Sequence, residues 1–433
     1  MELLTPPANA WNRGESPRVE YDSGIPHMNA AAVLTTKLSG RLDAHFTPRG
    51  VQPHVVATAS VLLVGGAAWL GTGYGYRHGA LFLIGAACGL VLYHSAFGFT
   101  AAYRALVTAG DGRGLRAQAL MLAVATVLFA PILAGGHGLD TPVIGAVAPA
   151  GVSVLVGAFV FAIGMQLGGG CGSGTLFHVG SGATPLVFTL TGFVAGSVIA
   201  TFHMVFWTSL PALGAISLGE TLGWPRAVAV QVAALALIAG ASWWIARRRW
   251  GARPPLPSPT RGWARLVHGV WPLLAGGVAL ACLNALTLVT AGHPWTITWA
   301  FALWGGKIVQ AMGYDLSTVP FWAGDFEQAA LAAPVLADVT SVMDFGIMLG
   351  ALLAAGLAGR FSPARRVPPR IVVASLLGGL LLGYGARIAY GCNIGAFFSG
   401  IASTSLHGWL WGVAALLGTP IGVRLRSLLG VGR

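Results

Sequence analysis

Apolar runs that approach the length of a membrane span recur along most of this chain. Of its 433 residues, 55% are hydrophobic and only 9% are charged, which is too apolar for a soluble core of this size. A helix that spans a bilayer needs about 20 predominantly apolar residues. Runs of roughly that kind lie at residues 55–70, 80–93, 120–133, 144–163, 186–202, 227–245, 268–289, 342–357, 371–390 and 406–423. The sequence therefore predicts an all-α, polytopic transmembrane protein with about ten spans in a lipid bilayer.

The basic residues between these runs predict the orientation. Arginines gather at residues 246–265, at 360–370 and after residue 423, and short loops rich in Lys and Arg stay on the cytoplasmic side. Four acidic residues of the second half gather in one loop, at Asp315, Asp325, Glu327 and Asp338. Ten spans with both termini in the cytoplasm satisfy every one of these loops. The net charge of +12 is then a topology signal, and no motif or basic stripe indicates a nucleic-acid partner.

Composition divides the chain into four parts. Residues 1–50 are polar and lack the apolar core of a signal peptide, so we expect a poorly ordered cytoplasmic tail. Residues 51–245 form a first transmembrane half, 246–265 a basic cytoplasmic linker, and 266–433 a second transmembrane half. Glycine, at 63 residues, is frequent inside the apolar runs, where it permits close helix packing and local breaks.

Two segments repeat each other at a constant offset. They are Gly164-Met-Gln-Leu-Gly-Gly-Gly-Cys171-Gly-Ser-Gly174 and Gly385-Ala-Arg-Ile-Ala-Tyr-Gly-Cys392-Asn-Ile-Gly395. The predicted topology places the span before Cys171 and the span before Cys392 in opposite directions. The sequence therefore predicts two halves of inverted topology, each turning around a cysteine inside the bilayer.

The residues after each cysteine suit the start of a half-helix. Helix N-termini present free N–H groups and a positive dipole end, which hold anions without a metal. The candidate contacts are Gly172, Ser173, Gly174, Thr175, Asn393 and Gly395. Glycine and proline also interrupt residues 94–104 and 292–307, where we expect two further re-entrant elements.

At these residues the chain resembles the YeeE/YedE sulphur-transport family of bacterial inner-membrane proteins. The carrying motifs are Phe97-Gly-Phe-Thr-Ala-Ala-Tyr-Arg104, Gly169-Gly-Cys-Gly-Ser-Gly-Thr175, Pro294-Trp295, Phe301-Ala-Leu-Trp-Gly-Gly-Lys307, Gly383-Tyr-Gly-Ala-Arg387, Gly391-Cys-Asn-Ile-Gly-Ala-Phe-Phe-Ser-Gly400 and His407-Gly-Trp-Leu-Trp411. The likeness runs from about Gly79 to the C-terminus.

This resemblance implies an hourglass-like transporter that takes up thiosulfate. Cysteine thiols would pass the sulphur-containing anion between two vestibules, and Cys171 and Cys392 match the family's Gly-Cys-x-x-Gly turns. The chain departs from the family at Gly98, where a third cysteine often stands. The resemblance also implies a bacterial inner-membrane location and a separate, small TusA-like sulphur-carrier protein in the cytoplasm as partner.

Other residues have both a functional and a structural interpretation. Cys88 and Cys282 stand in no break motif, and a cysteine in an apolar helix is usually a small hydrophobe. Arg387 either adds positive charge to an anion path or pairs with Asp344 or a carbonyl. Lys307 stands near a helix end, where a lysine commonly extends its ammonium group to the membrane interface. The Thr100 hydroxyl either contacts the anion or satisfies a backbone group that the break frees. The aromatic residues near span ends are predicted to be interfacial anchors, at Trp243, Trp244, Trp409 and Trp411.

The leading function is thus a permease for thiosulfate or a related small sulphur anion. A transporter of another inorganic solute, such as a selenium species, is the first alternative, and a membrane thiol redox protein is the second. No His/Asp/Glu constellation accompanies the cysteines, so we expect no enzyme. The sequence has no metal-ligand spacing, no cofactor motif and no ATP-binding P-loop, so we expect no metal and no cofactor.

Overall fold

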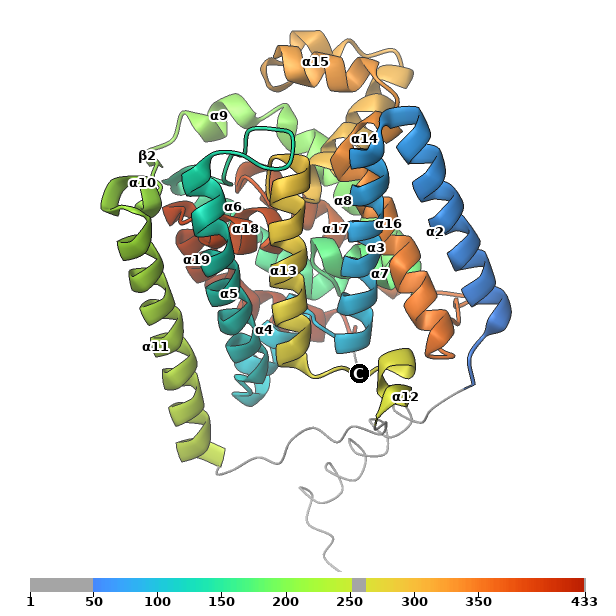
Figure 1. The fold of residues 1–433 in the computed structure, drawn as a ribbon, viewed down its shortest axis with the longest axis horizontal. Coiled ribbons are helices and arrows are strands. Elements are labelled where there is room, and N and C mark those ends of the chain that lie inside the picture. Colours follow the sequence, from blue (N-terminus) through green and yellow to red (C-terminus); the bar gives the residue numbers. More distant parts are fainter. Residues whose placement is uncertain (1–49, 251–261, 432–433) are drawn as a thin grey trace, which may run out of the picture. The chain divides into compact units, whose positions relative to one another are not determined.

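The chain folds into helices because a bilayer offers no water to hydrogen-bond an open backbone. The structure is a computed structural model that describes residues 50–250 and 262–431, which belong to one unit, Pro48–Arg433 (Figure 1). The predicted tail and the middle of the predicted linker lie outside the described residues. The protein is an all-α polytopic membrane protein, as the sequence predicts.

Nine stretches of the described residues are long and apolar enough to span a membrane. They are α2 (Pro53–Tyr74), α3 (Tyr76–Ser95) with α4 (Phe99–Ala109), α5 (Arg113–Gly135), α6 (Val152–Gly168) with α7 (Gly172–Gly180), α11 (Trp224–Trp250), α13 (Leu273–Ala291), α16 (Val339–Leu357), α17 (Pro369–Ile388) with the π-helix η4 (Asn393–Phe398) and α18 (Ser399–Ala402), and α19 (Leu406–Leu428). A tenth apolar helix, α8 (Pro185–Thr201), has 17 residues. The prediction of about ten spans agrees with this set.

Four breaks interrupt these helices where the sequence predicts them. α3 ends at Ser95, its C-cap Ala96 is left-handed at φ 48°, and α4 begins at Phe99. α13 ends at Ala291 with Gly292 as its C-cap, and α14 (Thr298–Ala311) begins after six non-helical residues. The other two breaks are the cysteine turns between α6 and α7 and between α17 and η4. In Figure 1, α4 lies toward the lower side of the bundle and α14 toward the upper side.

Two predicted spans begin later than expected. In the 144–163 run, residues 144–148 are irregular and β1 (Pro149–Gly151) pairs antiparallel with β2 (Ala212–Ala215), so α6 starts only at Val152. In the 268–289 run, α13 starts at Leu273, after Pro272. Both starts are shifted by proline or glycine, which interrupt a helix within an otherwise apolar run.

Short elements join the spans. They are α9 (Met204–Thr208), α10 (Leu218–Leu222), α12 (Trp263–His268), the 3₁₀ turns η1 (Leu316–Thr318), η2 (Pro320–Trp322) and η3 (Val335–Ala337), and α15 (Asp325–Ala332). The acidic loop predicted from the sequence contains η1 to η3 and α15.

Close contacts at glycines show how the central helices α6 and α17 run relative to each other. A Cβ at Gly157 would lie 2.7 Å from the Gly385 carbonyl oxygen, and one at Gly164 would lie 2.7 Å from that of Gly378. As the residue numbers rise in α6 they fall in α17, so these two helices are antiparallel. The long helix that comes after each half-helix packs beside the helix that precedes the other cysteine turn: α8 packs on α17, and α19 packs on α6. This arrangement agrees with two halves of inverted topology. The boundaries of the two halves and of the linker remain a prediction from the sequence.

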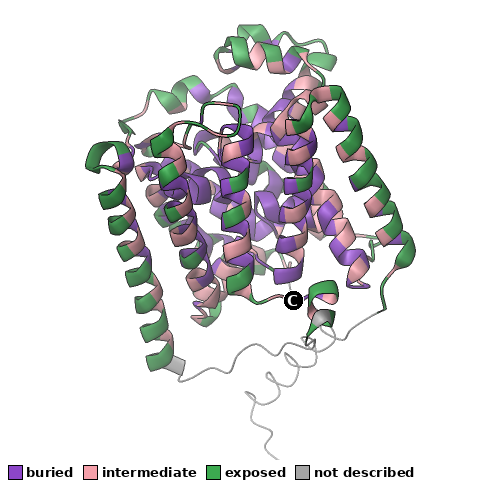
Figure 2. Ribbon diagram, in the orientation of Figure 1, coloured by how far each residue is buried: buried purple, intermediate pink, exposed green. Residues whose placement is uncertain are grey.

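Burial distinguishes the central helices from the flanking ones. Figure 2 shows buried residues concentrated in the middle of the bundle, whereas α2 and α11 on opposite flanks are mostly exposed. Only 22% of the most apolar window of α2, and 11% of that of α11, is buried inside the protein. These two apolar helices therefore present their outer faces to lipid.

Candidate functional site

The two cysteine turns have the same backbone conformation. Cys171 has φ −91° and ψ −165°, and Cys392 has φ −92° and ψ −165°. Each is the N-cap of the following half-helix, and each is 0% exposed. The repeat seen in the sequence is therefore a repeated local structure.

Each thiol sulfur accepts a backbone hydrogen bond from its own turn. The amide of Gly174 donates to the Cys171 Sγ at 3.4 Å, and that of Ile394 donates to the Cys392 Sγ at 3.4 Å. Sulfur thus takes the place that a Ser or Asp oxygen usually has at an N-cap. This geometry directs a lone pair of each sulfur at the backbone and leaves its S–H proton to donate elsewhere.

A left-handed residue ends the helix before each cysteine. It is Gly169 at φ +82° in the first turn and Tyr390 at φ +59° in the second. Such a reversal frees backbone carbonyls, which need donors inside a membrane protein. The Thr189 hydroxyl donates to the Gly168 carbonyl at 2.9 Å, and the Trp411 indole N–H donates to the Gly391 carbonyl at 3.1 Å. Both turns are thereby held from a neighbouring helix.

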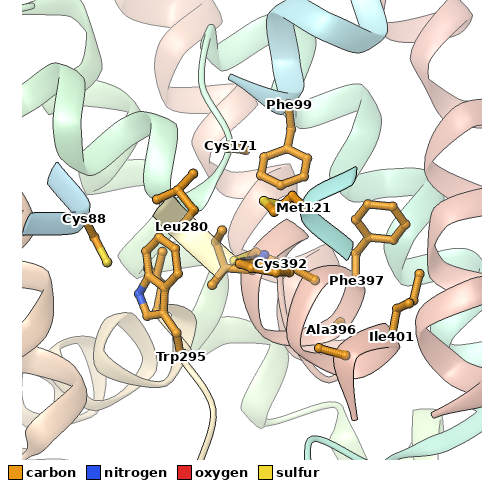
Figure 3. Packing of buried hydrophobic residues seen from close by; sticks show 14 of the residues in the cluster. Cys88, Phe99, Met121, Cys171, Leu280, Trp295, Cys392, Ala396, Phe397 and Ile401 are labelled. Carbon is orange, nitrogen blue, oxygen red and sulfur yellow. Dashed lines mark hydrogen bonds between the residues drawn. The ribbon is translucent and has the colours of Figure 1, made fainter. Parts of the chain in front are cut away.

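The two turns meet in the core of the protein. A Cβ added at Gly172 would lie 2.8 Å from the Cys392 Sγ and 3.7 Å from Cγ2 of Ile297. Figure 3 shows Cys392 near the centre of this cluster, with Cys171 and Phe99 above it and Trp295 at the lower left. The start of the first half-helix therefore touches the thiol of the second turn, which brings two residues 220 positions apart into one site.

Several polar side chains around the turns are buried without a partner. The Thr175 Oγ1, the Thr100 Oγ1 and both side-chain polar atoms of Asn393 have no hydrogen bond among the described residues. The Ser173 hydroxyl lies 3.6 Å from the Cys171 Sγ. A buried donor or acceptor left unsatisfied costs about 1–3 kcal/mol, so such a cluster is typical of a site that receives a polar ligand or water.

Two cavities lie at the other two helix breaks. The larger, of about 470 Å³, is lined by residues before and within α14, by α15 and by the start of α16, and we call it the α14 cavity. Its wall includes Thr296, whose hydroxyl would lie 3.1 Å from a Cβ at Gly395. The smaller, of about 200 Å³, is lined by Gly98, by α4 and by the start of α5, and we call it the α4 cavity. Each cavity thus adjoins one of the two predicted re-entrant elements.

The structure places the two charged candidates away from the thiols. The half-buried Arg387 donates from Nη2 to the Thr298 carbonyl at 2.7 Å and lies 5.3 Å from the ring centre of Phe321. The alternative in which it pairs with Asp344 is wrong, because both oxygens of that carboxyl lack a hydrogen-bond partner in the described chain. The Lys307 Nζ donates to the carbonyls of Leu331 and Ala333, at 2.7 and 2.5 Å, and so holds the loop that follows α15.

The remaining cysteines stand outside the paired turns. Cys88 is buried in α3, and Cys282 is exposed on α13. Both have the environment of a cysteine used as a small apolar residue. All four cysteines are free thiols. In residues 50–250 and 262–431, no group of three or more His, Cys, Asp or Glu side chains is placed to hold a metal ion.

Two tryptophans have environments that the sequence did not predict. Trp411 was predicted as an interfacial anchor, but it is 0% exposed and holds the second cysteine turn. Trp295 is also 0% exposed, and its indole N–H has no acceptor among the residues described. Trp243 and Trp244, in contrast, are each 50% exposed and stack with Arg247 and Arg248 near the end of α11, as expected of anchors.

Comparison with known proteins identifies relatives of this arrangement. Residues 94–421 match the family model described as Sulphur transport. The chain is 31% identical over 171 residues to the protein named "Probable transporter YedE" of Escherichia coli, a match that covers 38% of this chain and 41% of that protein. The chain therefore spans about two fifths of the length of this YedE relative.

A longer match joins the chain to proteins with a named substrate. It is 26% identical over 360 residues to "Thiosulfate transporter TsuA" of Spirochaeta thermophila, covering 78% of this chain and 95% of that protein. It is 25% identical over 369 residues to the protein of the same name from Escherichia coli, covering 78% and 91%. Both cysteine turns lie within the residues matched by the family model.

Proposed function

Because this chain belongs to the sulphur transport family, we propose that it takes up thiosulfate or a related small sulphur anion through its paired cysteine turns. The observation that carries this proposal is the contact between Gly172 and the Cys392 thiol, with a second thiol at the equivalent turn. A relative named as a thiosulfate transporter matches the chain over most of its length, which favours thiosulfate among sulphur anions.

The site recognises an anion by donors alone. The Gly174 amide donates to the Cys171 sulfur, whereas the amides of Gly172 and Ser173 have no acceptor within α7 and lie at its positive end. The two S–H groups add donors that soft, polarisable sulfur accepts, and the hydroxyl of Thr175 and amide of Asn393 add more. Hydrogen bonds to an ion are about twice as strong as neutral ones, and together they replace part of the water that the anion loses.

The anion moves from the α14 cavity to the α4 cavity. It passes Thr296, then Cys392, then Cys171, and leaves beside Gly98. In the described conformation the Gly172 backbone packs on the Cys392 sulfur, so the passage between the turns is closed and the two turns separate during transport. No bond to sulfur is made or broken in this scheme, and the protein is a carrier rather than an enzyme.

The direct test measures thiosulfate uptake in a bacterial strain that lacks its own sulphate and thiosulfate importers. Wild type, Cys171→Ala and Cys392→Ala are compared at equal membrane expression, with Cys282→Ala as the matched control because that thiol faces outward from α13. We expect uptake to be lost in the first two variants and kept in the control. Full uptake by both turn variants would refute a thiol relay.

Two additions to this experiment separate the alternatives. Competition of the uptake by selenite or selenate at equal concentration would reassign the substrate to a selenium species. Mass spectrometry of Cys171 and Cys392 after exposure to thiosulfate tests for a redox protein, since a persulfide on either thiol would mean covalent chemistry rather than carriage.

The surroundings of the carrier belong to the same proposal. The chain lies in the bacterial inner membrane with both termini in the cytoplasm, and a TusA-like sulphur carrier meets its basic cytoplasmic face. Arg365, Arg366 and Arg370 are exposed there and suit an acidic partner. Co-purification with such a carrier, lost on replacing these arginines by glutamine, tests this contact.

A further inference from the structure

Two arginines from different helices converge on one buried glutamine near the first cysteine turn. The Arg104 Nε, on α4, donates to Oε1 of Gln166 at 2.9 Å, and the Arg426 Nη1, on α19, donates to the backbone carbonyl of Gln166 at 2.9 Å. Gln166 is 0% exposed and stands in the last turn of α6, five residues before Cys171. The pair is thus attached to the helix that leads into the proposed passage.

Close packing fixes both arginines in place. Gly422, one turn before Arg426, lies against α6, and a Cβ there would be 2.9 Å from the Cβ of Gln166. The Gln166 side-chain amide also donates to the carbonyl of Thr100, one turn before Arg104, at 3.3 Å. Figure 1 shows α4 and the C-terminal end of the chain on the same lower side of the bundle. Rigid helices therefore hold the two guanidiniums toward one face.

The pair has positive charge without a counter-charge. Both guanidiniums donate to Gln166, so two positive charges are held beside one residue. Arg113 forms an ion pair with Asp111. Among the described residues, neither Arg104 nor Arg426 has a carboxylate partner. Both side chains are half-buried. Two like charges held together at partial burial are unfavourable unless an anion joins them.

We propose that Arg104 and Arg426 form a binding site for a tetrahedral oxyanion, which is the transported sulphur anion on its way out of the passage. This site rests on the proposed function for the identity of its ligand. Each guanidinium keeps N–H groups that Gln166 does not use, and the planar fork matches an oxyanion through paired hydrogen bonds. The site lies on the α4 side of Cys171, on the face that the arginine bias predicts to be cytoplasmic. Partial exposure and screening by salt keep the binding weak enough for release.

The test uses the wild-type protein and reads out each arginine separately. The purified protein in nanodiscs of zwitterionic lipid reacts with phenylglyoxal, and mass spectrometry follows modification of Arg104, Arg426 and Arg365. Arg365 is exposed on a loop with other arginines and is the matched control. Saturating thiosulfate should slow modification of Arg104 and Arg426 about tenfold, which corresponds to one charge-assisted contact, and should leave Arg365 unchanged.

Two results overturn the site. Equal protection of all three arginines means general charge screening, and no protection of Arg104 and Arg426 means no site. A parallel arm with phosphatidylglycerol in place of thiosulfate distinguishes the other source of a tetrahedral oxyanion, and protection by this lipid alone rejects the substrate as ligand. Because this assay needs no transport, a wild type that fails to take up thiosulfate would refute the proposed function while leaving the protection result to be judged by itself.

Transport kinetics supply a second readout. In inside-out vesicles, Arg104→Gln and Arg426→Gln should raise the KM for thiosulfate offered from that face about tenfold with little change in the maximal rate, and Arg104→Lys should recover part of the loss. Arg424→Gln, at an exposed position on α19, should behave as wild type. An unchanged KM in both glutamine variants, with normal expression, would overturn a role for the pair in substrate binding.

Discussion

At the scale of single residues, the absence of a side chain at Gly172 is as important as the two thiols. Its Cα approaches the Cys392 sulfur so closely that a methyl group would lie 2.8 Å from it, well inside the optimal contact distance of about 3.5–4.0 Å between heavy atoms. The sulfur cannot retreat without weakening its hydrogen bond from the Ile394 amide. Glycine is therefore required for the two turns to touch.

Gly172→Ala should reduce thiosulfate uptake about tenfold or more without preventing insertion. Overpacking a buried contact costs about 1–3 kcal/mol, and every 1.4 kcal/mol is about a factor of ten. Uptake at equal expression measures the effect. Gly65→Ala is the matched control, because no atom lies within 4 Å of a Cβ at that helical position. Normal uptake by Gly172→Ala would mean that substrate does not pass between the turns.

Gly98 is the position where the family often has a third cysteine, and the structure has room for one. A Cβ there would meet only Ala101, at 3.9 Å, and the φ of −128° suits any residue. Gly98→Cys should fold normally and improve the apparent affinity for thiosulfate on the α4 side about fivefold, as expected from one added hydrogen bond of about 1 kcal/mol.

Two substitutions at the same position control for size and for the donor. Gly98→Ala fills the space without a donor and should leave the affinity unchanged, and Gly98→Ser adds a hydroxyl donor in place of the thiol. KM measured in inside-out vesicles compares all three. If alanine improves the affinity as much as cysteine does, then filling the cavity, and not the thiol, is responsible.

The sequence predicts single residues well where one pattern is sufficient and poorly where two distant segments must meet. The repeated Gly-Cys-x-x-Gly spacing, with a further glycine seven residues before each cysteine, identifies both cysteine turns because the same local geometry is encoded twice. The same spacing gives no signal for the contact of Gly172 with Cys392. It also gives none for the hydrogen bond from Arg426 to the Gln166 carbonyl, which joins residues 260 positions apart. Trp411 was misassigned because its place near a span end is typical of an anchor, whereas the freed carbonyl of Gly391 is visible only in the fold.

At the scale of helices, the close crossing of α6 and α17 positions the first turn. A Cβ at Gly378 would collide with the backbone nitrogen of Gly168 and would lie 2.9 Å from the carbonyl carbon of Leu167. Backbone atoms cannot move aside as a flexible side chain can, so the helices would separate at the residues that lead into Cys171.

Gly378→Ala should therefore lower the thermal unfolding midpoint in detergent and abolish uptake together. The expected destabilisation is about 1–3 kcal/mol. Gly240→Ala on α11, where a Cβ meets no atom within 4 Å, should leave the midpoint unchanged or raise it, because alanine favours the helix over glycine. If Gly378→Ala unfolds at the wild-type temperature, the crossing does not limit stability.

The ends of the helices are also predicted well where the signal is local and poorly where distant segments meet. Long apolar runs predict the existence of the spans, because length and hydropathy are local properties. They misplace the start of α6, because the pairing of Pro149–Gly151 with Ala212–Ala215 joins segments about 60 residues apart. The four breaks were predicted because glycine and proline mark them directly in the sequence.

At the scale of the whole bundle, antiparallel α6 and α17 predict that the two cavities open to opposite sides of the membrane. The α14 cavity contains Ala333 and the α4 cavity contains Ala101. We expect Ala333→Cys to react with a membrane-impermeant thiol reagent on intact cells, and Ala101→Cys to react only in inside-out vesicles. Both substitutions are made in a Cys282→Ala background, which removes the one exposed native thiol.

Each outcome of this labelling tests a different part of the proposed transport scheme. The expected pattern supports inverted halves with the arginine-rich face in the cytoplasm. The reverse pattern would keep the inverted halves but overturn the orientation drawn from the arginine bias, and would make the Arg104 and Arg426 pair an entry site instead of an exit site. Reaction of both cysteines from the same side would contradict a passage between the two cavities, because an anion moving past Cys392 and Cys171 must enter and leave on opposite faces.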